Sequence, residues 1–413
     1  MSLSRHISFG VLRYHIPMRK HNFLPGLCTA LALGEAGGAL TPTCADLWPA
    51  VAVAAVFVLL FGYGLAVRGW RLVFVALLGL CLFYRASVAQ EHLYREKPWL
   101  RHARRHQQAE PYDAGSPLTR LRKDFSRRLG LGLEHAPALA SLNRAILLGE
   151  RANLPRTTRL TFVNAGTIHV FAISGLHVMI VAWLIVYLLL LARLPLRLAG
   201  LVSLPVLWGY VVVIGLPPSA VRAALMASFY FLAPLFWRKP DSLVAWELTF
   251  LCVHLVRPAH IANVGSVLSF TVMFAILLTV RTVRGILPRR LQHLVVAGAA
   301  WAAGVPIAAH VFGRVTPGGL LANLALIPAA TVTVVSGALG LLASFVSEKL
   351  AAHLNNGAAL FTNLMVGISR LVASLPGANF ETRPWSFLEC ALWYAALLAI
   401  PLAFNHWRSR RAF

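Results

Sequence analysis

Acidic residues are scarce in this chain of 413 residues. It has 14 Asp and Glu against 38 Lys and Arg, a formal net charge of +24, and only 13% of all residues are charged. Hydrophobic residues make up 58%, and the mean hydropathy is +0.69. Soluble domains typically carry about 25% charged residues, so this composition excludes a soluble protein and indicates a polytopic membrane protein. The positive charge leaves two interpretations open: basic loops that fix orientation and contact anionic lipid, or attraction to a polyanion.

Cysteine is also sparse, and its spacing excludes two kinds of site. The five cysteines form no CxxC pair, which excludes the usual zinc and dithiol redox motifs. Cys81, Cys252 and Cys390 lie in apolar runs and are expected to be small buried hydrophobic residues. Cys28 and Cys44 flank an apolar segment, and a spanning helix between them would forbid a disulfide. A GxxxxGK[ST] loop is missing too, so an ATP-driven motor would have to be another protein.

What the chain does have is a long apolar run with a polar leading edge. Residues 178–192 are apolar, and residues 166–177 before them carry hydroxyls, histidines and two glycines. The polar or flexible positions are Gly166, Thr167, His169, Ser174, Gly175 and His177. Polar groups are costly in hydrocarbon and usually face protein or a water-filled path. The stretch is therefore either a membrane helix with a polar, loop-like start, or a broken or re-entrant element that lines a conduit.

The same stretch resembles the signature of the ComEC competence family, whose members are bacterial inner-membrane proteins that pass single-stranded DNA into the cytoplasm during natural transformation. The resemblance covers about residues 118–401, with further matches in the family's order. These matches are Leu147–Arg151, Pro217–Met226, Arg238–Asp241, Thr316–Leu324 with Ile327–Pro328, and Ser374–Gly377. One position departs from the pattern: Val267 stands where the family usually has glutamine. If that glutamine lines the family's path, this protein lacks one contact.

The resemblance implies a channel for single-stranded DNA in the bacterial inner membrane. The residues expected along the transport path are Thr167, His169, Ser174, Gly175, His177, Ser219, Arg222 and Asn323. Ser219 can also cap the helix that follows Pro218. Arg222 would lie one turn inside that helix, where it either snorkels to the interface or presents a fixed positive charge to a phosphate. Because buried charges need partners, Glu247 is its expected ion-pair partner.

Of two further domains in larger family members, we expect most of the first and all of the second to be missing here. Residues 91–140 occupy the position of an OB-fold domain but are too few for a five-stranded barrel and lack the alternation of strands. An HxHxDH cluster of the metallo-β-lactamase type, which two catalytic metals require, is also missing. We therefore expect no nuclease activity, catalytic residue, metal or cofactor in this chain. A separate nuclease and a cytoplasmic motor or single-strand-binding protein are the expected partners, beside the DNA strand and membrane lipids.

The predicted fold is all-α, with about ten to eleven transmembrane or re-entrant helices and one short polar basic segment. The expected organisation is a cytoplasmic arm (1–22), an N-terminal membrane unit (23–90), the polar segment (91–140), a competence-type membrane domain (141–404) and a cytoplasmic basic tail (405–413). Residues 320–346 would form either one tilted helix or a broken pair around Pro328. The oligomeric state is left open.

Residues 118–133 predict a basic amphipathic helix. Leu118, Leu121, Phe125 and Leu129 recur at helical spacing, and arginines and a lysine fill the positions between them. Such a helix either lies on anionic headgroups or guides nucleic acid. Both interpretations assume that the basic side chains are exposed.

Three functional hypotheses follow from these features. The first is the DNA channel, and the second is a small-solute transporter or pore on the same scaffold. The third is a remnant that transports nothing. Ser174 and His177, three residues apart, could also form a nucleophile and base, but no orienting carboxylate or oxyanion-hole pattern accompanies them, so an intramembrane hydrolase is not expected.

Overall fold

A computed structural model describes residues 115–152, 154–256, 263–397 and 399 of the chain. All of them belong to one compact unit, Gly79–Phe413. The elements in chain order are α5 (Pro117–Arg128), α6 (Pro137–Leu148), α7 (Arg156–Asn164), η2 (Ile168–Phe171), α8 (Gly175–Leu191), α9 (Leu196–Val213), α10 (Pro218–Leu232), η3 (Ala233–Phe236), α11 (Ser242–Val256), α12 (Val264–Val283), α13 (Arg289–Phe312), β1 (Arg314–Val315), α14 (Gly318–Ala343), α15 (Glu348–Ser374) and β2 (Phe380–Glu381). The predicted arm (1–22), N-terminal membrane unit (23–90) and basic tail (405–413) lie outside the described residues.

The predicted all-α membrane fold is confirmed. Within the described residues, 6 helices are long and apolar enough to cross a membrane: α9, α10 with η3, α12, α13, α14 and α15. Shorter apolar helices are α6, α8, α11 and a last helix over Phe387–Leu397. The two strands, β1 and β2, are two residues long and pair antiparallel, with Arg314 opposite Glu381.

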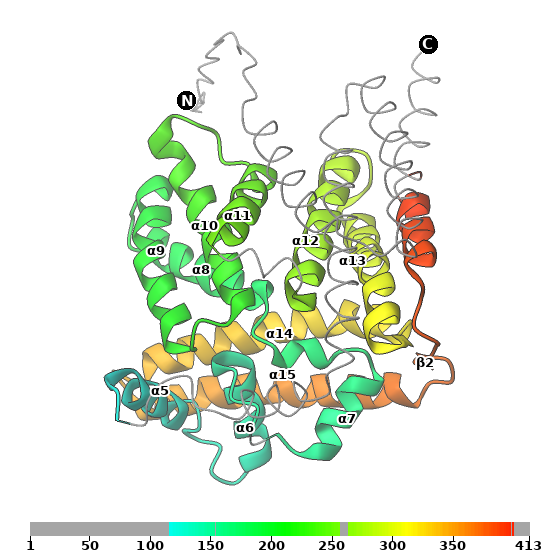
Figure 1. The fold of residues 1–413 in the computed structure, drawn as a ribbon. Coiled ribbons are helices and arrows are strands. Elements are labelled where there is room, and N and C mark those ends of the chain that lie inside the picture. Colours follow the sequence, from blue (N-terminus) through cyan, green and yellow to red (C-terminus); the bar gives the residue numbers. More distant parts are fainter. Residues whose placement is uncertain (1–114, 153, 257–262, 398, 400–413) are drawn as a thin grey trace, which may run out of the picture. The chain divides into compact units, whose positions relative to one another are not determined.

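The helices α14 and α15 form the base of the unit. They make the most extensive contact between any two described elements, and Figure 1 shows them side by side beneath α8–α11 at one end and α12–α13 at the other. Two glycines of α14 allow the close approach. A Cβ on Gly340 would lie 2.5 Å from Asn355 Oδ1 of α15, and one on Gly337 would lie 2.7 Å from Leu147 of α6. A methyl group at either position would displace the Asn355 or Leu147 side chain.

Proline does not break α14. The helix continues from Gly318 to Ala343 with Pro328 inside it. Of the two predicted alternatives, one helix or a broken pair, the structure therefore has one helix.

A proline in a helix leaves the carbonyl four residues earlier without its usual donor. In α13 this carbonyl belongs to Ala302, four residues before Pro306, and it accepts a hydrogen bond of 2.9 Å from Trp393 Nε1 of the last helix. Tyr394 makes a similar bond to the neighbouring Ala303 carbonyl. The last helix therefore satisfies the backbone groups of the proline turn.

The predicted basic helix forms as α5, but not all of its basic side chains are exposed. Arg122 is only 7% exposed, and it donates to the Leu148 carbonyl at the C-terminal end of α6 at 3.0 Å. Leu121, predicted to lie on the apolar face, is 40% exposed. Positive side chains stabilise helix C-termini because the last carbonyls carry partial negative charge. One side of α5 thus clamps neighbouring helices, and neither of the two predicted surface roles applies to Arg122.

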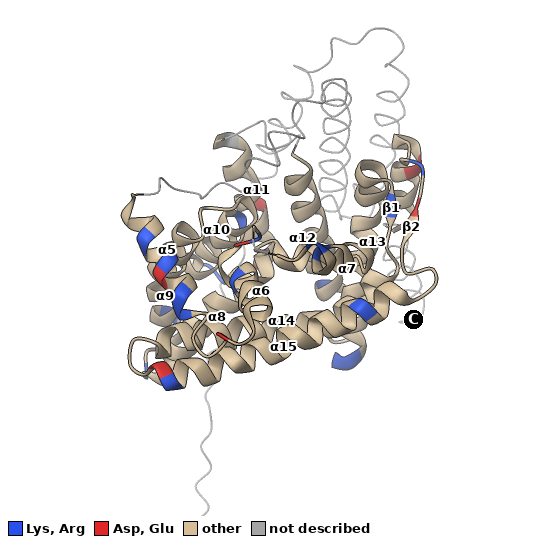
Figure 2. Ribbon diagram, turned by 90° about the horizontal axis from the view of Figure 1, so that it is seen from below, with Lys and Arg blue, Asp and Glu red and all other residues tan. Residues whose placement is uncertain are grey.

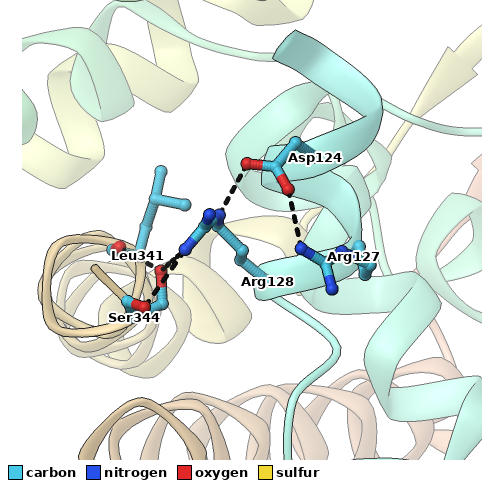
Figure 3. Close-up of polar contacts among 5 residues, drawn as sticks. All are labelled: Asp124, Arg127, Arg128, Leu341 and Ser344. Carbon is cyan, nitrogen blue, oxygen red and sulfur yellow. Dashed lines mark hydrogen bonds and ion pairs between the residues drawn. The ribbon is translucent and has the colours of Figure 1, made fainter. Parts of the chain in front are cut away.

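Arg128 makes the second clamp of α5. Its guanidinium donates to Asp124 at 2.6 Å and to the backbone carbonyl of Ser344, the C-cap residue that follows α14, at 3.1 Å (Figure 3). The same guanidinium lies over the ring of Phe345, 4.3 Å from its centroid. Arg127 also donates to Asp124, at 2.9 Å. The C-terminus of α14 is therefore capped by Arg128 of α5, which is 216 residues away from Ser344 in the chain.

Candidate functional site

The signature stretch forms a short irregular connection between α7 and α8. Its backbone leaves α7 at Gly166 with a φ of +71°, turns through the 3-10 helix η2, and enters α8 at Gly175. The left-handed conformation favours glycine, because a Cβ would be crowded there. Phe162 of α7 packs edge-on against Phe171 of η2 with ring centroids 4.6 Å apart. The predicted break in helical structure is therefore real and rigidly held.

Ser174 and His177 close the start of α8 as a capping box. The Ser174 hydroxyl accepts from the backbone N–H of His177 at 3.4 Å, and His177 Nδ1 accepts from the backbone N–H of Ser174 at 3.3 Å. Each side chain thereby satisfies an N–H that the first helical turn leaves open. The histidine nitrogen is bonded to a backbone group and not to the serine hydroxyl. This geometry orients neither residue for nucleophilic attack.

Burial divides the predicted path residues into two groups. Thr167 is 0% exposed and His177 is 2% exposed. The Thr167 hydroxyl is bonded within the protein, to the Phe162 carbonyl at 3.4 Å and to the Ser369 hydroxyl of α15 at 3.3 Å. The prediction that these two side chains face an aqueous route is wrong, because they hold the motif together. His169 is exposed and Ser174 is partly buried.

Ser219 does not cap α10 as predicted. The residue before that helix is Pro217, and no side chain bonds to the first turn. The Ser219 hydroxyl instead donates to the Ile173 carbonyl, the residue just before the capping box. The bond ties α10 to the signature stretch.

Arg222 lies one turn further along α10 and joins it to α12. It is 6% exposed, and donates from Nε to the Ser269 hydroxyl at 3.2 Å and from Nη2 to the Gly265 carbonyl at 3.1 Å. The guanidinium carbon lies 5.7 Å from the ring centroid of Phe270. These neutral groups on α12 take the place of the expected carboxylate of Glu247, which lies on α11. Arg222 neither snorkels outward nor faces open solvent, so it acts here as a link between helices.

The start of α14 packs against the same stretch. A Cβ on Gly166 would lie 2.6 Å from Thr316 Oγ1, and Gly319 lies against the Gly166 carbonyl. Asn323 follows one turn into α14, partly buried, and its Oδ1 has no hydrogen-bond partner among the described residues. The segments around Gly166, Ser219 and Asn323 were all predicted to line the transport path. In the structure the signature stretch contacts the other two segments: Ser219 bonds to Ile173, and Thr316, just before α14, packs against Gly166.

Two contributors to the site were not predicted. Ser369 of α15 pairs with Thr167, and Arg151 donates from Nε to the Phe171 carbonyl of η2 at 2.7 Å. Arg151 belongs to the Leu147–Arg151 segment that resembles the family pattern, and this resemblance could have identified it as part of the site. Nothing in the sequence near Ser369 points to the motif, because the contact spans 202 residues. In the described part of the chain, no group of three or more His, Cys, Asp or Glu could hold a metal ion.

The profile of the competence protein family matches residues 146–407, well over half of the chain. The chain belongs to the competence family. A relative among curated proteins is ComE operon protein 3 of Bacillus subtilis (strain 168), 27% identical over 247 residues, which are 60% of this chain and 31% of that protein. This competence protein thus matches only about a third of that relative's length. No solved structure matches the chain.

The described residues include six helices long and apolar enough to cross a membrane, and the chain belongs to a family of competence proteins. The chain is therefore a multi-pass membrane protein. Membership also supports a role in DNA uptake at the level of the family.

Proposed function

We propose that this chain is an inner-membrane channel that passes single-stranded DNA into the cytoplasm during natural transformation. The observation that carries the proposal is the match of the competence family to residues 146–407. In this chain the stretch that resembles the family signature forms the irregular connection between α7 and α8, with a capping box at the start of α8. Irregular backbone at membrane depth is tolerated only where protein or a water-filled cavity surrounds it. A break held by Gly166, Thr167 and the capping box meets this requirement, and it leaves His169 exposed.

The charges of the turns suggest an orientation. The turn between α10 and α11 holds Arg238 and Lys239, the turn between α12 and α13 holds Arg284, and Arg289 and Arg290 begin α13. An ion pair of 3.7 Å joins Asp241, just before α11, to Arg281 in the last turn of α12, so the two turns lie at the same end of the helices. Figure 1 shows both turns at the end away from α14 and α15. Because short cytoplasmic loops are rich in Lys and Arg, we assign this end to the cytoplasm and the α14–α15 base to the outer side.

In this arrangement the signature stretch lies near the outer face, where a DNA strand would enter. The proposal leaves degradation of the second strand and the driving force to separate proteins. Ser174 and His177 serve the backbone of α8 in this account and carry no hydrolytic role.

An exposed position of the motif gives the sharpest test. His169→Glu would place a negative charge beside the entering strand, and we expect transfer of labelled DNA into the cytoplasm to fall at least about tenfold, because like charges repel. The matched control is His353→Glu, an exposed histidine on α15, which should leave transfer unchanged. Both variants should reach wild-type levels in the membrane. Equal transfer by the two variants would count against an entry at the motif.

The competing small-solute pore is tested by reconstitution. In that case, purified protein in liposomes would release a small dye without any nucleic acid and would be indifferent to His169→Glu. The DNA channel predicts the opposite in both respects.

A further inference from the structure

Most arginines around the base of the unit have a partner that accounts for them. Arg122 and Arg128 donate to the last carbonyls of α6 and α14. Arg314 pairs with Glu381, and Arg383 pairs with Glu389. Each positive charge is thereby compensated by a carboxylate or by the negative end of a helix.

Three arginines beside the signature stretch differ. Arg156 and Arg159 lie on α7 and are exposed, and their side chains make no hydrogen bond or ion pair with any described residue. The side chain of Arg151, in the connection before α7, bonds to the Phe171 carbonyl and to no other described residue. The one carboxylate close in sequence, Glu150, is already engaged by Ser126 at 2.9 Å and by Arg122 at 3.7 Å.

The fold brings Arg151 near Arg159, and Arg156 lies one helical turn before Arg159 on α7. The bond from Arg151 to Phe171 fixes one guanidinium against η2, and the packing of Phe162 on Phe171 fixes α7 against the same turn. Partial desolvation of the guanidinium where it bonds to η2, and then the nearby positive charge of Arg159, lower the pKa of Arg151. Like charges brought together without a carboxylate destabilise a fold unless an anion compensates them. In addition, the first turn of α7 carries no acidic side chain and no side-chain cap.

The positive-inside rule does not explain this group. Arg156 and Arg159 lie on α7 and Arg151 lies just before it, and Figure 1 shows α7 beside the α14–α15 base, away from the basic turns assigned to the cytoplasm. Figure 2, which views the unit from below, shows basic segments in blue at many places and few acidic ones in red. Among the described residues, carboxylates that could neutralise the three arginines are therefore few.

We infer that Arg151, Arg156 and Arg159 form a phosphate-binding patch that receives the phosphodiester backbone of the incoming DNA strand beside the signature stretch. Guanidinium groups bind phosphate through two parallel hydrogen bonds, which suits a chain of phosphates with no sequence requirement. The inference rests on the proposed function and names the side chains that first contact its substrate.

The test uses the full-length protein in nanodiscs of neutral phosphatidylcholine, with a fluorescent oligothymidylate as the probe. The double variant Arg156→Gln/Arg159→Gln removes two charges that bond to none of the described residues. We expect its affinity to fall about tenfold at low salt, and the slope of log affinity against log salt to decrease by about 1.4, or 0.7 for each lost phosphate contact. Arg284→Gln/Arg289→Gln, at the opposite end, is the matched control and should bind as the wild type does.

Several outcomes would overturn the patch. They are wild-type affinity in the double variant, an equal loss in the control variant, or no binding of the probe by the wild-type protein. A change only in the dependence of thermal stability on added phosphatidylglycerol, with oligothymidylate binding unchanged, would instead assign the arginines to lipid headgroups.

The patch and the channel can fail separately. If deletion of the gene abolishes DNA transfer while the double variant binds and transfers normally, the patch is wrong and the channel stands. If deletion leaves transfer intact, the channel itself is wrong.

Discussion

Adding a single methyl group at Gly166 is expected to damage the signature stretch more than at any other glycine near it. Its φ of +71° lies in the left-handed region. The Cβ of an alanine there would lie 2.6 Å from Thr316 Oγ1, 2.7 Å from Thr316 Cβ and 3.3 Å from Gly319 Cα. Contacts this short cannot persist, and the Thr316 Cβ cannot move without its backbone. Gly166→Ala therefore pushes α14 away from the motif.

The cost has two parts. A non-glycine residue in the left-handed region loses about 1–2 kcal/mol. Overpacking a well-filled interior typically costs about 1–3 kcal/mol more. Together they amount to about 2–5 kcal/mol, a large share of the roughly 5–15 kcal/mol that stabilises a folded protein.

Two other glycines provide a graded comparison. Gly149 also has a positive φ, +72°, but its Cβ would meet the flexible end of Ile173, at 2.9 Å. Gly367 lies within α15 with nothing within 4 Å of a Cβ, where alanine should stabilise the helix by about 0.5–1 kcal/mol. The assay is thermal unfolding of the purified proteins in detergent, followed by tryptophan fluorescence. The midpoints should rise in the order Gly166→Ala, Gly149→Ala, Gly367→Ala. Equal midpoints for the first and last variants would refute the reasoning.

Three further variants test the helix clamps by the same thermal assay. Arg122→Ala removes the partner of the Leu148 carbonyl and of Glu150 and should cost about 3–5 kcal/mol, whereas the exposed Arg120→Ala should be nearly neutral. A wild-type midpoint for Arg122→Ala would contradict the clamp. Trp393→Phe leaves the Ala302 carbonyl without a donor and should cost about 1–3 kcal/mol; no shift would show that this carbonyl needs no partner. Hydrogen bonds from Arg128 and then Arg127 lower the pKa of Asp124 from its usual 3.8. The ionised carboxylate therefore stabilises the fold above pH 3.8, and this stabilisation is lost as the pH falls through the pKa of the folded state. The difference in midpoint between the wild type and Asp124→Asn should therefore be full near neutral pH and shrink below pH 3.8, and a difference that does not change with pH would contradict this.

The sequence predicted what depends on local pattern. Apolar runs gave the membrane class and most helices of the described part, and the polar stretch from Gly166 to His177 was correctly expected to interrupt them. Local pattern does not mark the first part of α15, since Glu348 to Gly357 is polar on one face and lacks the continuous apolar run of a membrane span.

The errors concern which groups the side chains meet. Thr167 and His177 were expected to face water because polar groups in an apolar segment usually do. Thr167 instead bonds to the Ser369 hydroxyl on α15, and His177 accepts from the backbone N–H of Ser174 within the capping box. Arg122 was expected on a surface because its neighbours in sequence are basic, yet the carbonyl that binds it ends another helix. Such contacts join residues far apart in the chain, so no local pattern contains them.

The central claim is that this competence-family protein passes a DNA strand into the cytoplasm. The most direct measurement is the amount of labelled DNA that becomes protected in the cytoplasm when the gene is deleted from its bacterium and then restored. The account predicts that deletion abolishes protected DNA while binding at the cell surface persists, and that the wild-type gene restores it whereas His169→Glu does not. Normal accumulation of cytoplasmic DNA in the deletion strain would contradict the claim.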